Sequence, residues 1–180
     1  MKKWILSVCT LIAALVAAAP AAAVFAEEDS AMVAAKSSLL MHADTGTVIL
    51  ENNADARYPI ASMCKIMTLL LTFEQIDGGG LSLDQDIVVS EHAAGMGGSD
   101  IWLKEGEQMT ADDLIKACVV MSANDAAVVL AEAVAGSEDA FVERMNARAA
   151  ELGMNDTVFK NCNGLDEDGH ITSAYDVAVM

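Results

Sequence analysis

The sequence of 180 residues predicts a domain that mixes β-strands with α-helices. Three observations predict this class: two short apolar runs around a turn signal, one long apolar run, and a series of helix start and stop signals after residue 110. A hydrophobic fraction of 54% is too high for a disordered chain. We therefore expect one folded domain behind a short N-terminal signal segment.

The N-terminal segment has the pattern of an export signal. Two lysines precede an apolar stretch over residues 4–18, and Ala26 stands directly before the first acidic residue, with Val24 two positions earlier. Signal peptidase requires small or aliphatic side chains at these two positions. We predict a signal peptide over residues 1–26 and the domain over residues 27–180. An uncleaved membrane anchor is the alternative, because the apolar stretch is just long enough to span a bilayer.

The first elements of the predicted domain form a hairpin. The runs 37–43 and 47–51 are short and rich in apolar residues, and Asp44-Thr45-Gly46 between them is a turn sequence. Residues 52–59 are polar and predict irregular structure. Farther along, Ile87-Val88-Val89 predicts a short strand, and the Gly-rich stretch 91–99 predicts a loop.

The apolar run from Ile60 to Ile76 predicts a central helix. Its apolar residues lie almost all round the helix, which is typical of a buried helix. Asp77 and the three glycines after it end the run.

Three further helices are predicted after this run. Thr110 with Asp113 three residues later is a helix start, a second helix covers about residues 124–135, and Ser137 begins a third that stops at Gly153. A last helix start over residues 172–176 is followed by four residues only. Because a helix of about seven residues is marginal in water, we expect this chain to be a piece of a longer protein.

Composition excludes several classes of function. Ten basic and 27 acidic residues give a net charge of -17, which disfavours binding to a phosphate backbone, so no nucleic-acid partner is expected. Four cysteines without a C-x-x-C pair are no disulfide scaffold, and the three histidines are far apart in the sequence. We therefore predict no metal site.

Ser62 and Lys65 are the first candidates for chemistry. Residues three apart lie on one face of a helix, so the hydroxyl and the amine are predicted to meet. A serine needs a base, and a buried lysine can be that base because desolvation lowers its pKa. The alternatives are that Ser62 only caps the helix and that Lys65 extends its amine to solvent.

Ser122 and Asn124 form a second candidate pair, between two predicted helices. A hydroxyl and a carboxamide in a turn can relay a proton and bind a substrate amide. A cap for the following helix explains the pair equally well.

The two pairs together, S-x-x-K followed by S-x-N, begin the signature of penicillin-interacting serine enzymes. With the residues around them, the sequence resembles the low-molecular-weight penicillin-binding proteins, which are serine D-alanyl-D-alanine carboxypeptidases of the peptidase S11 type. The resemblance covers nearly everything from Ser37 to Met180. The matching stretches are Ala61-Ser62-Met63-Cys64-Lys65-Ile66-Met67-Thr68, Met121-Ser122-Ala123-Asn124-Asp125-Ala126-Ala127, Phe141-Val142-Glu143-Arg144-Met145-Asn146, Leu152-Gly153-Met154-Asn155-Asp156-Thr157, Asn163-Gly164-Leu165-Asp166 and Gly169-His170-Ile171-Thr172-Ser173-Ala174-Tyr175-Asp176.

The resemblance implies roles for four residues. Ser62 would attack the carbonyl of the penultimate D-alanine in a peptidoglycan stem peptide, and water would hydrolyse the resulting acyl-enzyme. Lys65 would accept the proton of Ser62, Ser122 would relay a proton to the leaving amine, and Asn124 would bind substrate or orient Lys65. β-Lactam antibiotics would acylate Ser62.

The resemblance also implies the fold and the location. The fold would be an α/β (α+β) architecture of the β-lactamase/DD-peptidase type, in which a helical region flanks an antiparallel sheet, incomplete at its C-terminal side. The protein would be exported to the bacterial cell envelope. It would touch the membrane only peripherally, through a C-terminal anchor missing here.

The main departure from the family pattern is that the sequence has no K-T-G, the third motif, whose strand supplies a cation and completes the oxyanion hole. Cys64 also stands where the family commonly has Thr. We therefore expect this fragment to be inactive on its own. Two alternatives are a class A-type β-lactamase, which would turn penicillin over quickly, and a non-catalytic cell-wall-binding protein.

Overall fold

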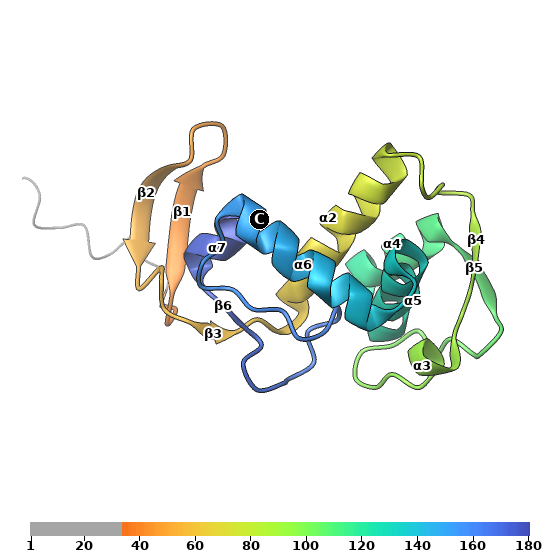
Figure 1. Ribbon diagram of the computed structural model, residues 1–180. Helices are drawn as coiled ribbons and strands as arrows, with labels where there is room; N and C mark the ends of the chain where they lie inside the picture. Colours follow the sequence, from red (N-terminus) through yellow and green to blue (C-terminus); the bar gives the residue numbers. More distant parts are fainter. Residues whose placement is uncertain (1–33) are drawn as a thin grey trace, which may run out of the picture. The chain divides into compact units, whose positions relative to one another are not determined.

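The computed structural model describes residues 34–180, so the predicted signal peptide, residues 1–26, lies outside the described residues. Residues 35–180 form one unit, and Figure 1 shows the order of its elements along the chain. Within the described part, no helix has the length and apolar character needed to cross a bilayer.

The predicted hairpin is confirmed as strands β1 (Ser38–His42) and β2 (Thr47–Asn52), which pair antiparallel. Their register shifts between Leu40 and Met41. Gly46 closes the turn with a φ of 65°, a conformation that glycine adopts without a steric penalty. The hairpin lies at the end of the unit opposite to strands β4 and β5 (Figure 1).

Two more antiparallel pairs complete the strands. β3 (Tyr58–Pro59) pairs with β6 (Ile171–Thr172), and β4 (Asp86–Val88) pairs with β5 (Gln108–Thr110). Of these four strands only β4 was predicted, from its run of β-branched residues. The others are too short to show an alternation of apolar and polar side chains. The β3–β6 pair ties the chain just before Ile60 to its C-terminal part, and so fixes the entry to the central helix.

The central helix begins with a 3₁₀ turn, η2 (Ala61–Met63), and continues as α2 (Cys64–Asp77). Met67 on one side is fully buried. The expectation of burial almost all round is wrong, because Ile66 and Phe73 are 45% and 44% exposed. These two side chains are seven positions apart, so they lie on one face of α2, and that face is only partly covered.

The three predicted helices are confirmed as α4 (Ala111–Val120), α5 (Asn124–Ala135) and α6 (Glu138–Leu152). Thr110 caps α4, and Ser137 caps α6 by accepting a hydrogen bond from the amide of Ala140. Gly153 ends α6 with a φ of 78°.

The two remaining helices are short; one was not predicted and the other was. The segment 91–99, predicted as a loop, contains α3 (Glu91–Ala94), because Ser90 accepts a hydrogen bond from Ala93 N and caps it. The predicted last helix start is confirmed as α7 (Ala174–Val179), whose cap is Ser173.

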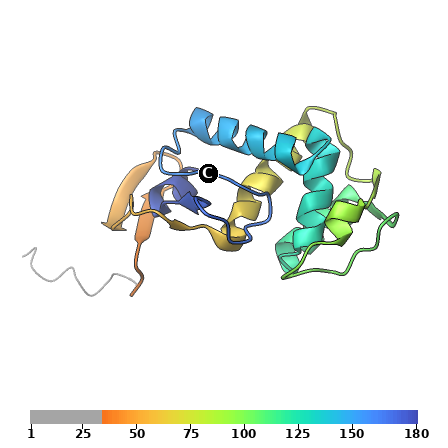
Figure 2. The same ribbon diagram turned by 60° about the horizontal axis from the view of Figure 1, so that its bottom comes forward.

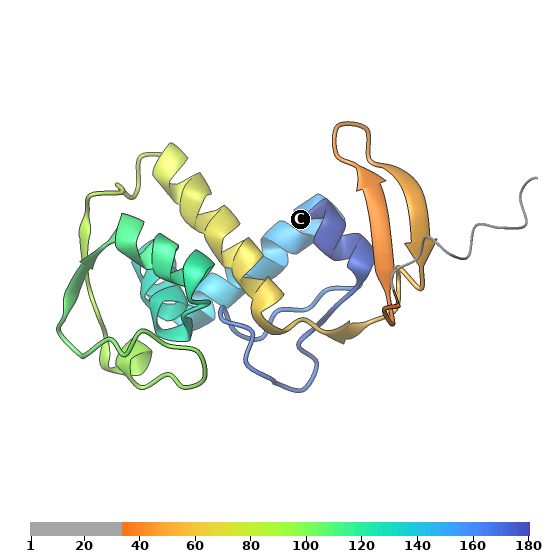
Figure 3. The ribbon, with the colours of Figure 1, turned by 180° about the vertical axis from the view of Figure 1, so that it is seen from behind.

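Helix α5 is the centre of the core, since it packs against α2, α4 and α6. Its run of alanines and valines is almost completely buried, and small side chains let neighbouring helices approach closely. Figure 2 shows α6 passing across α2, and Figure 3 shows α2 and α4 from the opposite side. This packing brings the first turn of α2 next to the first residue of α5.

Candidate active site

The Ser62–Lys65 pair lies where η2 joins α2. Lys65 Nζ is 3.4 Å from Ser62 Oγ, so the predicted meeting of hydroxyl and amine is observed. Neither η2 nor α2 receives a side-chain cap, and the N-cap position of α2 is Met63. The alternative in which Ser62 serves only as a helix cap is therefore wrong.

Lys65 is buried, with 4% of its surface exposed, so it does not extend to solvent. Its Nζ donates hydrogen bonds to Asn124 Oδ1 and to the carbonyl oxygen of Asn163, each at 2.6 Å. Removal from water disfavours the ammonium form and lowers the pKa of Lys65 below its ordinary value. A lowered pKa is what a lysine base near neutral pH requires.

Three buried cysteines are placed so that their charges, if ionised, would raise the pKa of Lys65: Cys64, Cys118 and Cys162. Burial raises the pKa of Cys64 and Cys118 to about 12 and that of Cys162 well above its ordinary value. The thiols therefore stay neutral and add no ion pair that would keep the lysine protonated. Over residues 34–180, the structure contains no group of three His, Cys, Asp or Glu arranged to hold a metal ion.

Asn124 is fixed on both sides of its amide group. Its Oδ1 accepts a hydrogen bond from Lys65, and its Nδ2 donates one to the carbonyl oxygen of Gly97 at 2.7 Å. The backbone N–H of Asn124 donates to the carbonyl oxygen of Ser99 at 2.6 Å. These contacts set the orientation of the carboxamide and connect the loop before β5 to the start of α5.

Ser122 lies in the turn between α4 and α5, with a φ of 54° that is unusual for a residue with a side chain. Its hydroxyl forms no hydrogen bond within the part of the chain that the structure describes. The structure thus brings Ser62, Lys65 and Asn124 into direct contact and places Ser122 two residues from Asn124 without such a contact.

The segment 161–165 is a part of the site that sequence reasoning missed. Besides the bond from Lys65 to Asn163, its Gly164 packs against the backbone before Ser62: a Cβ added there would lie 2.0 Å from the carbonyl oxygen of Ala61. Asn163 is 98 positions from Lys65. The Asn-Gly pair signals a turn, but nothing local in the sequence places that turn beside Ser62 and Lys65.

A loop beside Asn124 is held by the next residue of α5. The buried carboxylate of Asp125 accepts hydrogen bonds from the backbone N–H groups of Ile101 and Leu103. Directly before Ile101, Asp100 has one buried carboxylate oxygen without a hydrogen-bond partner in the described chain. Burial, and then the charge of Asp125, raises the pKa of Asp100.

A groove of about 400 Å³ lies elsewhere, between β1, β3 and α7. It is lined mainly by apolar atoms and includes Leu39, Tyr58, Met63 and Val177. Ser62 and Lys65 do not line it, so this groove is separate from the Ser62–Lys65 pair.

Comparison with known proteins gives one consistent family. The sequence model of the Peptidase S11 family, described as D-alanyl-D-alanine carboxypeptidase, matches residues 23–180. The chain is 49% identical over 146 residues to the D-alanyl-D-alanine carboxypeptidase DacF of Bacillus subtilis, with 81% of this chain and 38% of the relative covered. It is 35% identical over 154 residues to DacC of Escherichia coli, with 82% and 38% covered. The chain thus spans about 38% of the length of these curated relatives.

Solved structures are similar in the same region. The D-alanyl-D-alanine carboxypeptidase DacD from Francisella tularensis has a TM-score of 0.80 and 38% identity, with 82% of this chain and 36% of that chain covered. Penicillin-binding protein D2 from Listeria monocytogenes in its ampicillin-bound form has a TM-score of 0.71 and 30% identity, with 82% and 60% covered. The expected fold class, a helical region with antiparallel strands of the DD-peptidase type, is confirmed by these similarities.

Proposed function

Because this chain belongs to the peptidase S11 family of D-alanyl-D-alanine carboxypeptidases, we propose that it is the N-terminal part of a serine enzyme that removes the terminal D-alanine from peptidoglycan stem peptides. Residues 27–180 would supply the first part of the catalytic domain, behind a signal peptide over residues 1–26. The observation that carries the proposal is the buried Lys65, whose Nζ faces Ser62 Oγ, Asn124 Oδ1 and the Asn163 carbonyl.

The proposed mechanism starts from a neutral Lys65. A neutral amine has two N–H groups and one lone pair, and both Asn124 Oδ1 and the Asn163 carbonyl can only accept hydrogen bonds. Two N–H groups satisfy these acceptors, so the lone pair is left for the hydroxyl proton of Ser62. As the base takes this proton, Ser62 Oγ attacks the carbonyl carbon of the penultimate D-alanine.

Collapse of the tetrahedral intermediate expels the terminal D-alanine, whose amine needs a proton. Ser122, in the turn next to Asn124, is proposed to relay that proton from Lys65, while the Asn124 carboxamide keeps the lysine oriented. Water then attacks the ester on Ser62, with the neutral lysine again as base, and the free enzyme returns.

Several features of the proposal come from the family. A β-lactam would acylate Ser62 in place of the peptide, and the protein would act outside the cytoplasm, in the cell envelope, with at most a peripheral membrane contact through a C-terminal anchor. The chemistry requires no cofactor. The K-T-G strand, which is not in this sequence, would complete the oxyanion hole in the complete gene product.

Intact-mass measurement after ampicillin treatment tests the proposal on the complete gene product. We expect a single covalent ampicillin adduct that is lost in Ser62→Ala and Lys65→Ala and kept in Ser82→Ala, which removes an exposed hydroxyl elsewhere. Ser122→Ala should form the adduct more slowly. An adduct that persists in Ser62→Ala would overturn the assignment of the nucleophile.

The same measurement separates the two alternatives. A β-lactamase would release the adduct within the mixing time and accumulate hydrolysed ampicillin. A non-catalytic cell-wall-binding protein would give no adduct, and its association with peptidoglycan would be unchanged by Ser62→Ala.

A further inference from the structure

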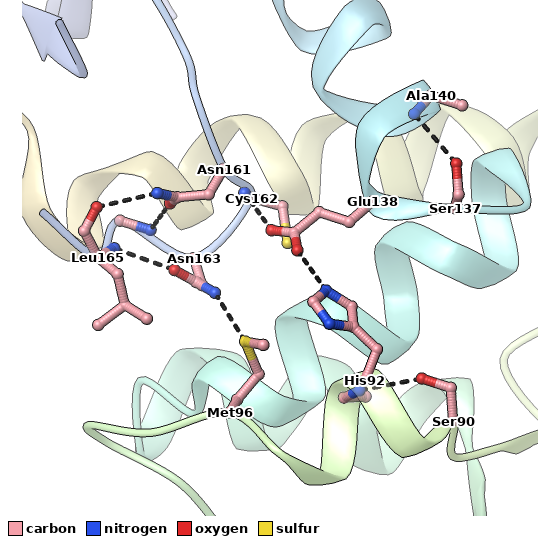
Figure 4. Close-up of polar contacts among 12 residues, drawn as sticks. Ser90, His92, Met96, Ser137, Glu138, Ala140, Asn161, Cys162, Asn163 and Leu165 are labelled. Carbon is pink, nitrogen blue, oxygen red and sulfur yellow. Dashed lines mark hydrogen bonds and ion pairs between the residues drawn. The ribbon is translucent and has the colours of Figure 1, made fainter. Parts of the chain in front are cut away.

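A carboxylate outside the catalytic pair connects to it through the backbone. Glu138, the first residue of α6, lies between His92 and Cys162 in Figure 4. Its Oε2 is 2.8 Å from His92 Nε2, and its Oε1 accepts a hydrogen bond from the backbone N–H of Cys162 at 3.0 Å. The Glu138 side chain is 14% exposed and that of His92 is 53% exposed.

These contacts keep the carboxylate charged. Burial by itself raises the pKa of Glu138, but the hydrogen bonds from the Cys162 backbone and from His92 outweigh burial, so the net pKa is below its ordinary value. A charged acceptor forms a stronger hydrogen bond to a backbone N–H than a neutral one. Glu138 is therefore a firm anchor for the segment that contains Cys162.

Cys162 is held at both of its backbone groups. Its N–H bonds to Glu138, from α6, and its carbonyl oxygen accepts from Thr68 Oγ1 at 2.6 Å, from α2. The next carbonyl along the chain, that of Asn163, accepts the hydrogen bond from Lys65 Nζ. The Asn163 side chain contacts the sulfur of Met96, which follows α3. The α3 region therefore contacts this segment at Met96 and contacts Glu138 at His92 (Figure 4).

We propose that Glu138 is a positioning residue for the lysine base. By fixing Cys162 to α6, it keeps the Asn163 carbonyl 2.6 Å from Lys65 Nζ, and this directs the amine toward Ser62 Oγ. Thr68 belongs to the same helix as Lys65, whereas Glu138 ties Cys162 to a separate helix, α6. Asn146 of α6 also bonds the backbone of Phe159, three residues earlier, so Glu138 is the α6 contact nearest to Asn163. The inference rests on the proposed function, because the orientation of the Lys65 amine toward Ser62 Oγ matters only if the lysine accepts the serine proton.

Three variants of the complete gene product test the inference. Glu138→Ala removes the acceptor for Cys162 N–H. Glu138→Gln keeps an oxygen acceptor in the same place but removes the charge. Asp139→Ala is the matched control, because Asp139 is the neighbouring acidic residue in the first turn of α6 and is exposed.

The first readout is the rate of acylation by saturating ampicillin together with the final adduct fraction, both from intact mass. Misplacement of a catalytic group by about 1 Å can lower a rate by about 100-fold, so we expect Glu138→Ala to acylate at least about tenfold more slowly, with the final fraction unchanged. Glu138→Gln should restore the rate to within about threefold, and Asp139→Ala should match the parent.

The second readout does not need activity: titration of Lys65 by NMR of ¹³Cε-labelled lysine. A carbonyl oxygen that accepts a hydrogen bond from the ammonium form stabilises that form. If Glu138→Ala moves the Asn163 carbonyl away from Lys65 Nζ, the pKa of Lys65 should therefore fall further. Glu138→Gln and Asp139→Ala should leave it near the parent value.

Distinct results overturn the inference or the proposed function. A parent protein without any ampicillin adduct contradicts the proposed function, and the lysine titration then still decides whether Glu138 positions Lys65. Four results would overturn the positioning role. In Glu138→Ala these are an acylation rate equal to that of the parent, a lower adduct fraction at an unchanged rate, or an unchanged pKa of Lys65. The fourth is an equal loss of rate in Asp139→Ala.

Discussion

Gly164 is the single residue on which the backbone geometry around Ser62 depends most directly. Its φ is 91°, and an added Cβ would lie 2.0 Å from Ala61 O and 2.9 Å from Ser62 N. Ala61 itself has a φ of 48°, so the turn directly before Ser62 is also strained. A residue without a side chain is required where two backbone segments approach this closely.

Gly164→Ala should therefore destabilise the protein by at least about 3 kcal/mol, because a backbone clash adds to the cost of the left-handed conformation. Gly106→Ala is the control: its φ is 79° and an added Cβ meets nothing within 4 Å, so it should cost about 1 kcal/mol. Urea unfolding of both variants measures the difference. Equal losses in the two variants would show that the close approach at Ala61 is unimportant.

At the scale of elements, the first turn of α5 organises the site and the loop beside it. Asn124 contacts Lys65 and the loop backbone, and Asp125 accepts from Ile101 and Leu103. One helix start thus contacts Lys65 on one side and holds the loop 99–103 on the other. The helix can do this because it packs against four other helices, α2, α3, α4 and α6.

Asp125→Ala is expected to lower the free energy of unfolding by about 3 kcal/mol, since a buried backbone N–H group, that of Leu103, and a partly buried one, that of Ile101, lose a charged acceptor. Hydrogen exchange at the amides of Ile101 and Leu103 should accelerate more than elsewhere. Asp113→Ala, an exposed aspartate in the first turn of α4, should cost less than about 1 kcal/mol. Unchanged exchange at the two loop amides in Asp125→Ala would contradict this role of the carboxylate.

At the scale of the whole molecule, the strongest feature is its acidic excess, with a net charge of -17. Like charges on a compact chain repel one another and destabilise the folded state, and dissolved salt screens this repulsion. The described chain contains few ion pairs that use its basic residues, among them Arg57–Asp156 and Arg148–Glu74. Most carboxylates therefore act through their summed field and not through specific partners.

We expect the melting temperature at neutral pH to rise when NaCl is raised from about 0.01 M to about 0.5 M, because the screening length falls severalfold. Calorimetry at each concentration measures the effect, with sucrose of matched osmolality as the uncharged control. Near pH 4 the carboxylates lose charge and the NaCl effect should shrink. A melting temperature that falls with NaCl at neutral pH would contradict repulsion as the main electrostatic term.

The sequence by itself determined the elements whose signals are local. Helix caps at Thr110 and Ser137 and the stop at Gly153 depend on residues within three or four positions of one another. The pairing of Ser62 with Lys65 is equally local, because one helical turn separates them. The family resemblance also rests on contiguous stretches, so it needed no structure.

Only the tertiary structure decided which distant groups complete the site. Strands β3 and β6 are too short for a periodic signal, and their pairing depends on residues more than a hundred positions apart. The Asn163 carbonyl meets Lys65 from 98 positions away, and Glu138 meets Cys162 from 24 positions away. Such contacts follow from how the helices pack against α5, and packing is a property of the whole chain that no window of sequence contains.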